Sequence, residues 1–188
     1  FEVAGASVVV TSDAADLADA ERIVLPGVGA FGIAMENLRS LGLEDALTRS
    51  VMEQRTPFLG ICLGMQLMAA KGLEYGYHRG LDWIPGTVDR LVPSSSDPRV
   101  PHVGWNEVDV VRDHPIFEGI EPGSDFYFVH SFAVSCDDAA HVAATTPYTG
   151  GFTSVVARDN AVGVQFHPEK SQQVGQRLIR NFLAWQPC

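Results

Sequence analysis

The first third of the chain alternates short apolar runs with amphipathic stretches. Residues 23–25 and 58–61 are continuous apolar runs, a pattern typical of strands buried on both faces. Between them, residues 31–39 and 43–53 are predicted to be helices, the second with one apolar stripe. This alternation predicts an α/β fold, in which parallel strands form a sheet with helices on both faces.

The second half breaks into shorter elements. Glycines between 72 and 86 interrupt any long element, and a final amphipathic helix is predicted over 173–184. The expected architecture is an open, mostly parallel sheet flanked by helices, with antiparallel additions in the second half. We expect one domain over 1–188, since nothing in the sequence indicates a linker or a repeat. Predicted strands, besides the two above, cover 7–10, 86–92, 108–110, 126–132, 142–145, 154–158 and 161–166.

A Gly-x-Cys-x-Gly motif follows the strand at 58–61. Gly60, Cys62 and Gly64 form the nucleophile-elbow pattern, with cysteine in place of serine. A sharp turn from strand to helix leaves no room for side chains beside the nucleophile and can require positive φ. Residues 65–71 are rich in helix formers, so a helix dipole is expected to favour the thiolate of Cys62. The alternative is a buried cysteine in a glycine-rich turn.

Two other predicted strands also end in polar or glycine-rich segments. His167 and Glu169 follow the strand at 161–166, and the 26–29 segment, Pro-Gly-Val-Gly, follows the strand at 23–25. Because ligand sites in open α/β sheets lie beyond the carboxyl ends of the strands, we expect these segments to lie close to Cys62. A histidine can serve a cysteine as base and acid, and a carboxylate can orient it. Taken singly, the histidine could be a capping residue, and the glycine-rich loop could cradle a phosphate.

Composition narrows the class of protein. The formal net charge of −10 disfavours nucleic acid as a partner, and no apolar run reaches the length of a membrane span. The three cysteines, Cys62, Cys136 and Cys188, have no CxxC spacing. This argues against a disulfide framework or a zinc site and fits the reducing cytoplasm.

The motifs together resemble the triad glutamine amidotransferase family. Gly-Ile-Cys-Leu-Gly-Met-Gln (60–66) and Val-Gln-Phe-His-Pro-Glu-Lys-Ser (164–171) carry this resemblance. Within the family, Leu-Pro-Gly-Val-Gly-Ala-Phe-Gly (25–32), Val-Pro-His-Val-Gly-Trp-Asn (100–106) and Tyr-Phe-Val-His-Ser-Phe (127–132) look like the glutaminase subunits of imidazole glycerol phosphate synthases. The resemblance covers nearly the whole chain.

The resemblance implies a role for each matching position. Cys62, His167 and Glu169 would be the catalytic triad that hydrolyses glutamine, without a cofactor or a metal. The segments expected to form the oxyanion hole and hold the α-amino and α-carboxylate groups of glutamine contain Gly27, Val28, Gly29, Leu63, Gln66, His130, Ser131 and Phe132. The residues expected at a subunit interface and the ammonia exit are Trp105, Asn106, Tyr127 and Lys170.

The implied partner is a (β/α)₈-barrel cyclase subunit. Ammonia released at Cys62 would react there with a nucleotide, giving imidazole glycerol phosphate and an aminoimidazole carboxamide ribotide in histidine biosynthesis. Three alternatives stay open: another triad amidotransferase, a cysteine peptidase or γ-glutamyl hydrolase, and a non-catalytic scaffold subunit. Family members open with a strand and a helix; this sequence begins where that helix would end. The first strand and most of the first helix are therefore expected to be absent from it, as in a fragment of a longer product.

Overall fold

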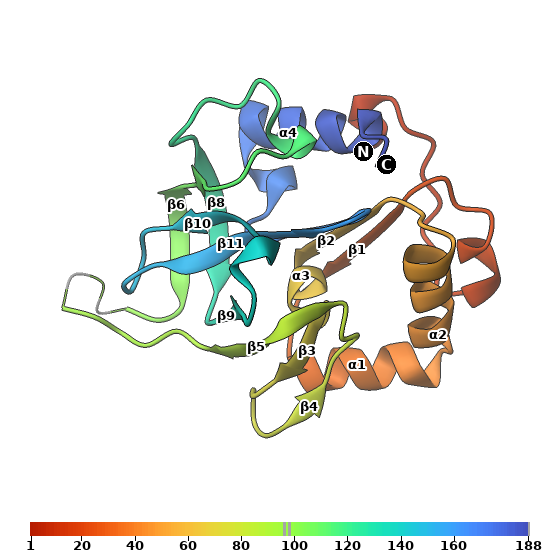
Figure 1. The fold of residues 1–188 in the computed structure, drawn as a ribbon, viewed down its shortest axis with the longest axis horizontal. Coiled ribbons are helices and arrows are strands. Elements are labelled where there is room, and N and C mark those ends of the chain that lie inside the picture. The colour runs from red at the N-terminus through yellow and green to blue at the C-terminus, as the bar shows by residue number, and fades with distance from the viewer. Residues whose placement is uncertain (96, 98, 188) are drawn as a thin grey trace.

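Three parallel strands form the centre of the molecule (Figure 1). In this computed structural model, which describes residues 1–95, 97 and 99–187, β2 (Phe58–Cys62) lies between β1 (Ile23–Gly27) and β12 (Ala161–Val164). Every residue of β2 is buried, which explains its continuous apolar run. The carboxyl ends of β1 and β2 lie side by side, because Gly27 is registered opposite Cys62.

The rest of the sheet extends from β12. The strand order is β1-β2-β12-β11-β9-β5-β3-β4, with β10 beside β11 and β7 beside β10. Most of the second-half strands pair antiparallel, as expected, and a separate antiparallel pair is formed by β6 and β8. The remaining strands are β3 (Ala69–Gly72), β4 (His78–Arg79), β5 (Ile84–Arg90), β6 (His102–Glu107), β7 (Asp109–Val110), β8 (Asp125–His130), β9 (Phe132–Cys136), β10 (Val142–Thr146) and β11 (Phe152–Arg158).

Helices cover both faces of the sheet, which confirms the layered architecture predicted from the alternation. α4 (Gln172–Ala184) packs on one face, and α1 (Phe31–Ser40) and α2 (Leu43–Thr48) pack on the other (Figure 1). Short helices connect the strands: α3 (Leu63–Leu67), a π-helical turn (Arg49–Glu53) and 3₁₀ turns at Glu2–Ala4, Ala14–Leu17, Pro115–Phe117, Ala139–His141 and Pro168–Lys170.

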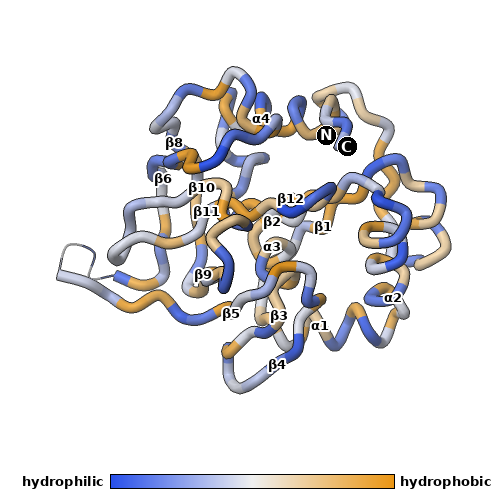
Figure 2. Tube along the Cα trace, in the orientation of Figure 1, coloured by the Kyte–Doolittle hydropathy of each residue, from blue (hydrophilic) through white to orange (hydrophobic). Residues whose placement is uncertain are grey.

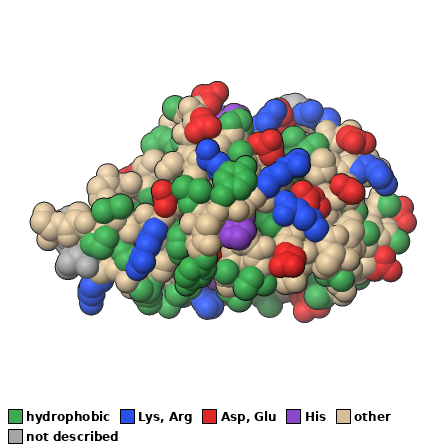
Figure 3. Space-filling model, turned by 90° about the horizontal axis from the view of Figure 1, so that it is seen from below, with side chains coloured by type: hydrophobic (Ala, Val, Ile, Leu, Met, Phe, Trp, Pro, Cys, Tyr) green, Lys and Arg blue, Asp and Glu red, His purple; other side chains and the backbone are tan. Residues whose placement is uncertain are grey.

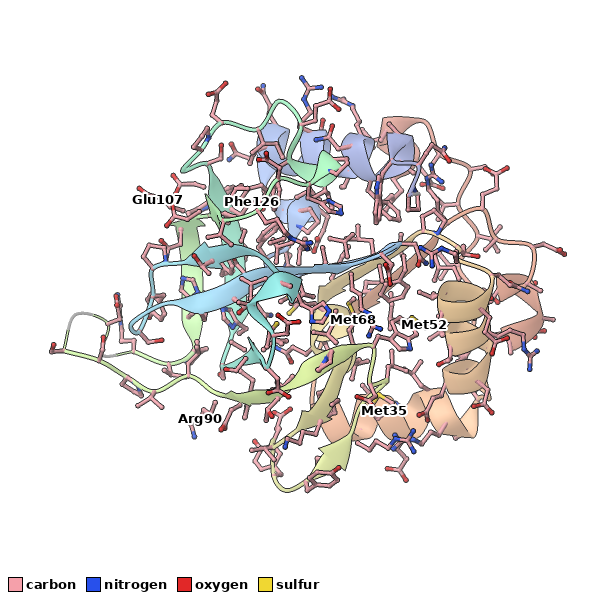
Figure 4. All side chains as sticks on the ribbon, in the orientation of Figure 1. Met35, Met52, Met68, Arg90, Glu107 and Phe126 are labelled. Carbon is pink, nitrogen blue, oxygen red and sulfur yellow. The ribbon has the colours of Figure 1, made fainter. Side chains whose placement is uncertain are left out.

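Side chains of β2 alternate between two hydrophobic cores. Leu59 packs in the core beneath α4, and Phe58 packs in the core beneath α1 and α2. The central strands are correspondingly rich in hydrophobic positions in Figure 2. Figure 4 shows Phe126 on the α4 side of the sheet, with Met35 and Met68 on the opposite side. The sheet is thus buried on both faces, as parallel strands require.

The expected strand at 7–10 does not form. This segment has no regular structure, and Val9 and Val10 are exposed by 77% and 95%. Local β propensity predicted the strand, but a strand needs a neighbour for its backbone groups, and none pairs with this segment within the described residues.

The helix expected over 65–71 is also wrong in extent. α3 ends at Leu67, and Ala69 begins β3, where it pairs with Ile84 of β5. Pairing with the sheet outweighs the helix propensity of these residues, which is a weak preference. Because α3 has only five residues, its dipole stabilises a thiolate at Cys62 less than the longer helix expected from the sequence would.

The surface is mixed in character. In the face that Figure 3 presents, hydrophobic side chains are interspersed with acidic and basic ones. Within the described part of the chain, no helix is long and apolar enough to cross a membrane.

Candidate active site

Cys62 occupies a strained turn between β2 and α3. Its φ is 53° and its ψ is −108°, a conformation rarely adopted by residues other than glycine. The flanking glycines provide space: a Cβ on Gly60 would lie 2.6 Å from the carbonyl oxygen of Gly64, and one on Gly64 would overlap the carbonyl oxygen of Leu25. The expected crowding is confirmed, but the positive φ belongs to the cysteine and not to either glycine.

The glycine-rich loop lies beside the nucleophile. Gly27 is registered opposite Cys62, and a Cβ there would come within 3.1 Å of the Leu63 side chain. Val28 is 81% exposed, and Gly29 has a φ of 111°. Leu63 is the first residue of α3, where an amide has no acceptor within the helix. The two segments expected to supply oxyanion donors therefore lie next to each other.

His167 and Glu169 form an ion pair. His167 Nδ1 lies 2.7 Å from Glu169 Oε1. The other ring nitrogen, Nε2, is buried without a well-formed hydrogen bond in the described structure, but the Cys62 sulfur is near enough to stabilise the imidazolium. Cys62 and Glu169 together raise the pKa of His167 to about 9, against burial, which lowers it. The imidazole is therefore mostly protonated at neutral pH.

The carboxylate keeps its charge beside this histidine. Burial acts to raise the pKa of Glu169, but the hydrogen bond from His167 and the charge of Lys170 outweigh burial and lower it. The pair thus has the form of an orienting carboxylate and an imidazolium.

Ser171 fixes the turn that carries His167. Its hydroxyl donates to the carbonyl of His167 (2.7 Å) and accepts from the amide of Tyr127 (3.0 Å). The amide of His167 in turn donates to the carbonyl of Tyr127 (2.8 Å). The histidine is therefore anchored to β8 directly, through its own amide, and indirectly, through Ser171.

Gln66 and Phe132 meet near the nucleophile. Gln66 Nε2 donates to the carbonyl of Phe132 (2.9 Å) and to Gln165 Oε1 (3.0 Å). Gln165 Nε2 lies 3.6 Å from the sulfur of Cys62 and donates to it. The side chain of Gln66 is buried within this network.

The ring of His130 is held by hydrogen bonds on this side of the site. The ring is buried, and both of its nitrogens are engaged, Nδ1 by the carbonyl of Phe132 (2.8 Å) and Nε2 by His102 Nδ1 (3.1 Å). Ser131 lies in the break between β8 and β9, and Phe132 opens β9. A single strand was expected over 126–132.

The residues expected at an interface divide between the two faces of the β6–β8 pair. Trp105 and Tyr127 are registered opposite each other with ring centroids 6.0 Å apart, and Lys170 Nζ lies 5.7 Å from the Tyr127 centroid. Asn106 is on the other face, where its amide nitrogen lies 3.3 Å from His102 Nε2. The first three residues thus form one partly exposed cluster, and Asn106 does not belong to it.

Two residues of the site were missed by sequence reasoning. Gln165 was placed in the strand at 161–166 and in the 164–171 motif, but its side chain was given no role, although a glutamine within a strand expected to be buried is a signal for a polar role. His102 lies in the 100–106 motif without an assigned role, and its contact with His130 depends on the register of β6 against β8.

Comparison with known proteins assigns the chain to a family. The profile of the family described as "Glutamine amidotransferase class-I" matches residues 4–185. The chain belongs to this family. As a class-I glutamine amidotransferase it resembles the "Imidazole glycerol phosphate synthase subunit HisH" of Brucella suis biovar 1, at 48% identity over 97% of this chain and 86% of the relative. The protein of the same name from Ruegeria pomeroyi is 49% identical over 99% of this chain and 88% of that protein.

Solved glutamine amidotransferase structures share the fold. One structure described as a glutamine amidotransferase superposes with a TM-score of 0.71 at 20% identity, covering 97% of this chain and 88% of that one. A glutamine amidotransferase from Thermotoga maritima has a TM-score of 0.58 at 22% identity, covering 86% of this chain and 61% of that one. The expected class I glutamine amidotransferase-like fold is thereby confirmed.

Proposed function

We propose that this chain is the glutaminase subunit of an imidazole glycerol phosphate synthase and that Cys62, His167 and Glu169 perform the hydrolysis of glutamine. The observation that carries the proposal is the meeting of three segments at one sheet edge: the strained cysteine, the glycine-rich loop opposite it, and the paired histidine. The near full-length similarity to HisH subunits supports the choice of pathway.

Each residue has a distinct part in the chemistry. The sulfur of Cys62 attacks the side-chain carbonyl carbon of glutamine, and the carbonyl oxygen takes the negative charge, stabilised by amides of Gly29 and Leu63. The C–N bond then breaks, the His167 imidazolium gives its proton to the leaving nitrogen, and ammonia departs from a thioester. His167 next takes a proton from water, and the resulting hydroxide attacks the thioester. The C–S bond then breaks, so that glutamate leaves and the Cys62 thiolate is restored beside the His167 imidazolium. Glu169 holds the imidazole throughout.

We further propose that ammonia passes to a (β/α)₈-barrel cyclase subunit. The cluster of Trp105, Tyr127 and Lys170 supports a docking surface on the β6–β8 pair, because aromatic residues and exposed apolar area are typical of interfaces. The exposed valines Val103 and Val129 lie on the same face, registered opposite each other.

The test is glutamate release from glutamine, measured with and without a barrel cyclase partner and its nucleotide. Cys62→Ala serves as the inactive variant, and Ala34→Ser in α1 is a control away from the site. We expect release from the unaltered chain with the partner, and none from Cys62→Ala. A folded chain without activity under any condition would contradict the proposal and favour a scaffold role. Turnover of peptides or polyglutamates without any partner would favour a hydrolase.

A further inference from the structure

A buried chain of hydrogen bonds connects the β6–β8 pair with the nucleophile. It begins at Asn106, whose amide contacts His102, and continues through the contact between His102 and His130. His130 and Gln66 both meet the carbonyl of Phe132. The chain ends with Gln66 on Gln165 and Gln165 on Cys62.

The direction of each hydrogen bond follows from one acceptor at the centre of the chain of hydrogen bonds, the carbonyl of Phe132. The carbonyl of Phe132 can only accept, so Nδ1 of His130 carries a proton and, in a neutral ring, Nε2 does not. His102 must then donate from Nδ1 to His130 Nε2, which leaves its own Nε2 to accept from the Asn106 amide. The hydrogen bonds therefore run in one direction, from the Asn106 amide through the two histidines to the carbonyl of Phe132.

The same carbonyl sets the orientation of two glutamines. Because Gln66 directs its amide nitrogen at Phe132 and at Gln165 Oε1, Gln165 presents its own nitrogen to Cys62. If the Gln165 amide were reversed, its oxygen would face the sulfur and repel the negative charge that develops there.

The surroundings of the two histidines favour the neutral rings that this arrangement requires. His102 is 3% exposed and stacks between Phe128 and Tyr148, at centroid distances of 4.8 and 3.9 Å. Burial lowers the pKa of His102 to about 4 and that of His130 to about 3, although Asp97 opposes the shift at His102 and the hydrogen bond with the Phe132 carbonyl opposes it at His130. His167 and His102 act in the same sense as burial on His130.

We propose that His102 and His130 are positioning residues of the glutaminase reaction, a neutral pair that fixes the Phe132 carbonyl and, through Gln66 and Gln165, presents an N–H donor to the sulfur of Cys62. This inference rests on the proposed function for its reaction. It gives the side chain of His130 a role distinct from contact with glutamine, since neither ring nitrogen is free.

The direct test is the protonation pattern of the histidines in the unaltered chain. Nuclear magnetic resonance of ¹⁵N-histidine-labelled protein is expected to show His102 and His130 with a proton on Nδ1 and none on Nε2. Signals are assigned by their loss in His102→Phe and in His130→Asn. A proton on His130 Nε2 would overturn the proposal.

The second test is His102→Phe, which keeps the stacking but removes both hydrogen bonds. We expect kcat for glutamine hydrolysis, with the partner present, to fall about tenfold while KM stays within twofold, as for the loss of one hydrogen bond to a developing charge. Alkylation of Cys62 by iodoacetamide, followed on its own peptide by mass spectrometry, is expected to slow similarly. His102→Gln, which retains a donor, should restore most of both rates.

His114→Phe is the matched control. His114 is a partly buried histidine against an aromatic ring, with its centroid 4.8 Å from that of Trp185, and within the described residues it has no link to the chain of hydrogen bonds. We expect it to lose stability and keep the alkylation rate of Cys62. A folded His102→Phe with kcat and alkylation within twofold of the unaltered protein would refute the proposal. If the unaltered protein hydrolysed no glutamine, but Cys62 alkylation still depended on His102, the proposed function would fail and the positioning of Cys62 would stand.

Discussion

Replacing Cys62 by glycine or by alanine measures the strain stored at the nucleophile. Both variants lose the thiol and the contact with Gln165, so they differ only in the Cβ that a φ of 53° disfavours. Relief of backbone strain should stabilise the glycine variant by about 1–3 kcal/mol. Against this, glycine costs about 0.5–1 kcal/mol in chain entropy and about 0.8 kcal/mol for one buried methyl group. The glycine and alanine variants at position 62 should therefore have nearly the same free energy of unfolding.

The control is Ala157→Gly in β11, a buried strand position without positive φ. At that position glycine brings only the cost in chain entropy and the loss of a buried methyl group. We therefore expect the free energy of unfolding to fall by about 1.5 kcal/mol. Urea unfolding followed by circular dichroism resolves this difference, since about 1.5–2 kcal/mol shifts the midpoint by about 0.5–1 M at ordinary m-values. Equal losses at the two positions would refute the claim that the turn is strained.

Three further changes test the site. Gly64→Ala should prevent the elbow from closing, because the new Cβ would overlap the carbonyl of Leu25; loss of the cooperative unfolding transition would be the signature, and a native-like midpoint would contradict it. Ser171→Ala should cost about 1–3 kcal/mol in urea unfolding, since it strands two buried backbone groups, and an unchanged midpoint would argue against the anchor. Because the pKa of His167 is raised from 6.5 to about 9, the folded state binds its proton more tightly, so unfolding free energy should fall as pH rises from about 6.5 to 9. Glu169→Gln should flatten that fall, and a slope identical to that of the unaltered protein would exclude the pair as its source.

Local motifs predicted the parts of the site that the chain carries in short segments. The elbow around Cys62 and the pair of His167 with Glu169 are each complete within a few residues, so spacing and residue type were sufficient. The neighbouring position of the glycine-rich loop also followed, because parallel strands align their carboxyl ends at one edge of a sheet.

Features that depend on contacts between residues far apart in the sequence could not be predicted from local motifs. The segment 7–10 has the composition of a strand, but composition does not reveal whether a neighbour is present. The contact of His102 with His130 depends on the register of two strands that pair only in the folded chain. The chain of hydrogen bonds behind Gln165 could not be found for the same reason.

The central position of β2 has a consequence for how the protein matures. Its second neighbour, β12, pairs Ala161 with Phe58, so the strand that delivers His167 is synthesised long after the cysteine. Contacts of such wide sequence separation carry a larger entropic cost of loop closure than local contacts do. A nascent chain released before β12 would display its thiol without the imidazole, the glutamine and the anchoring serine. The surroundings of Cys62 are therefore complete only when β12 pairs with β2.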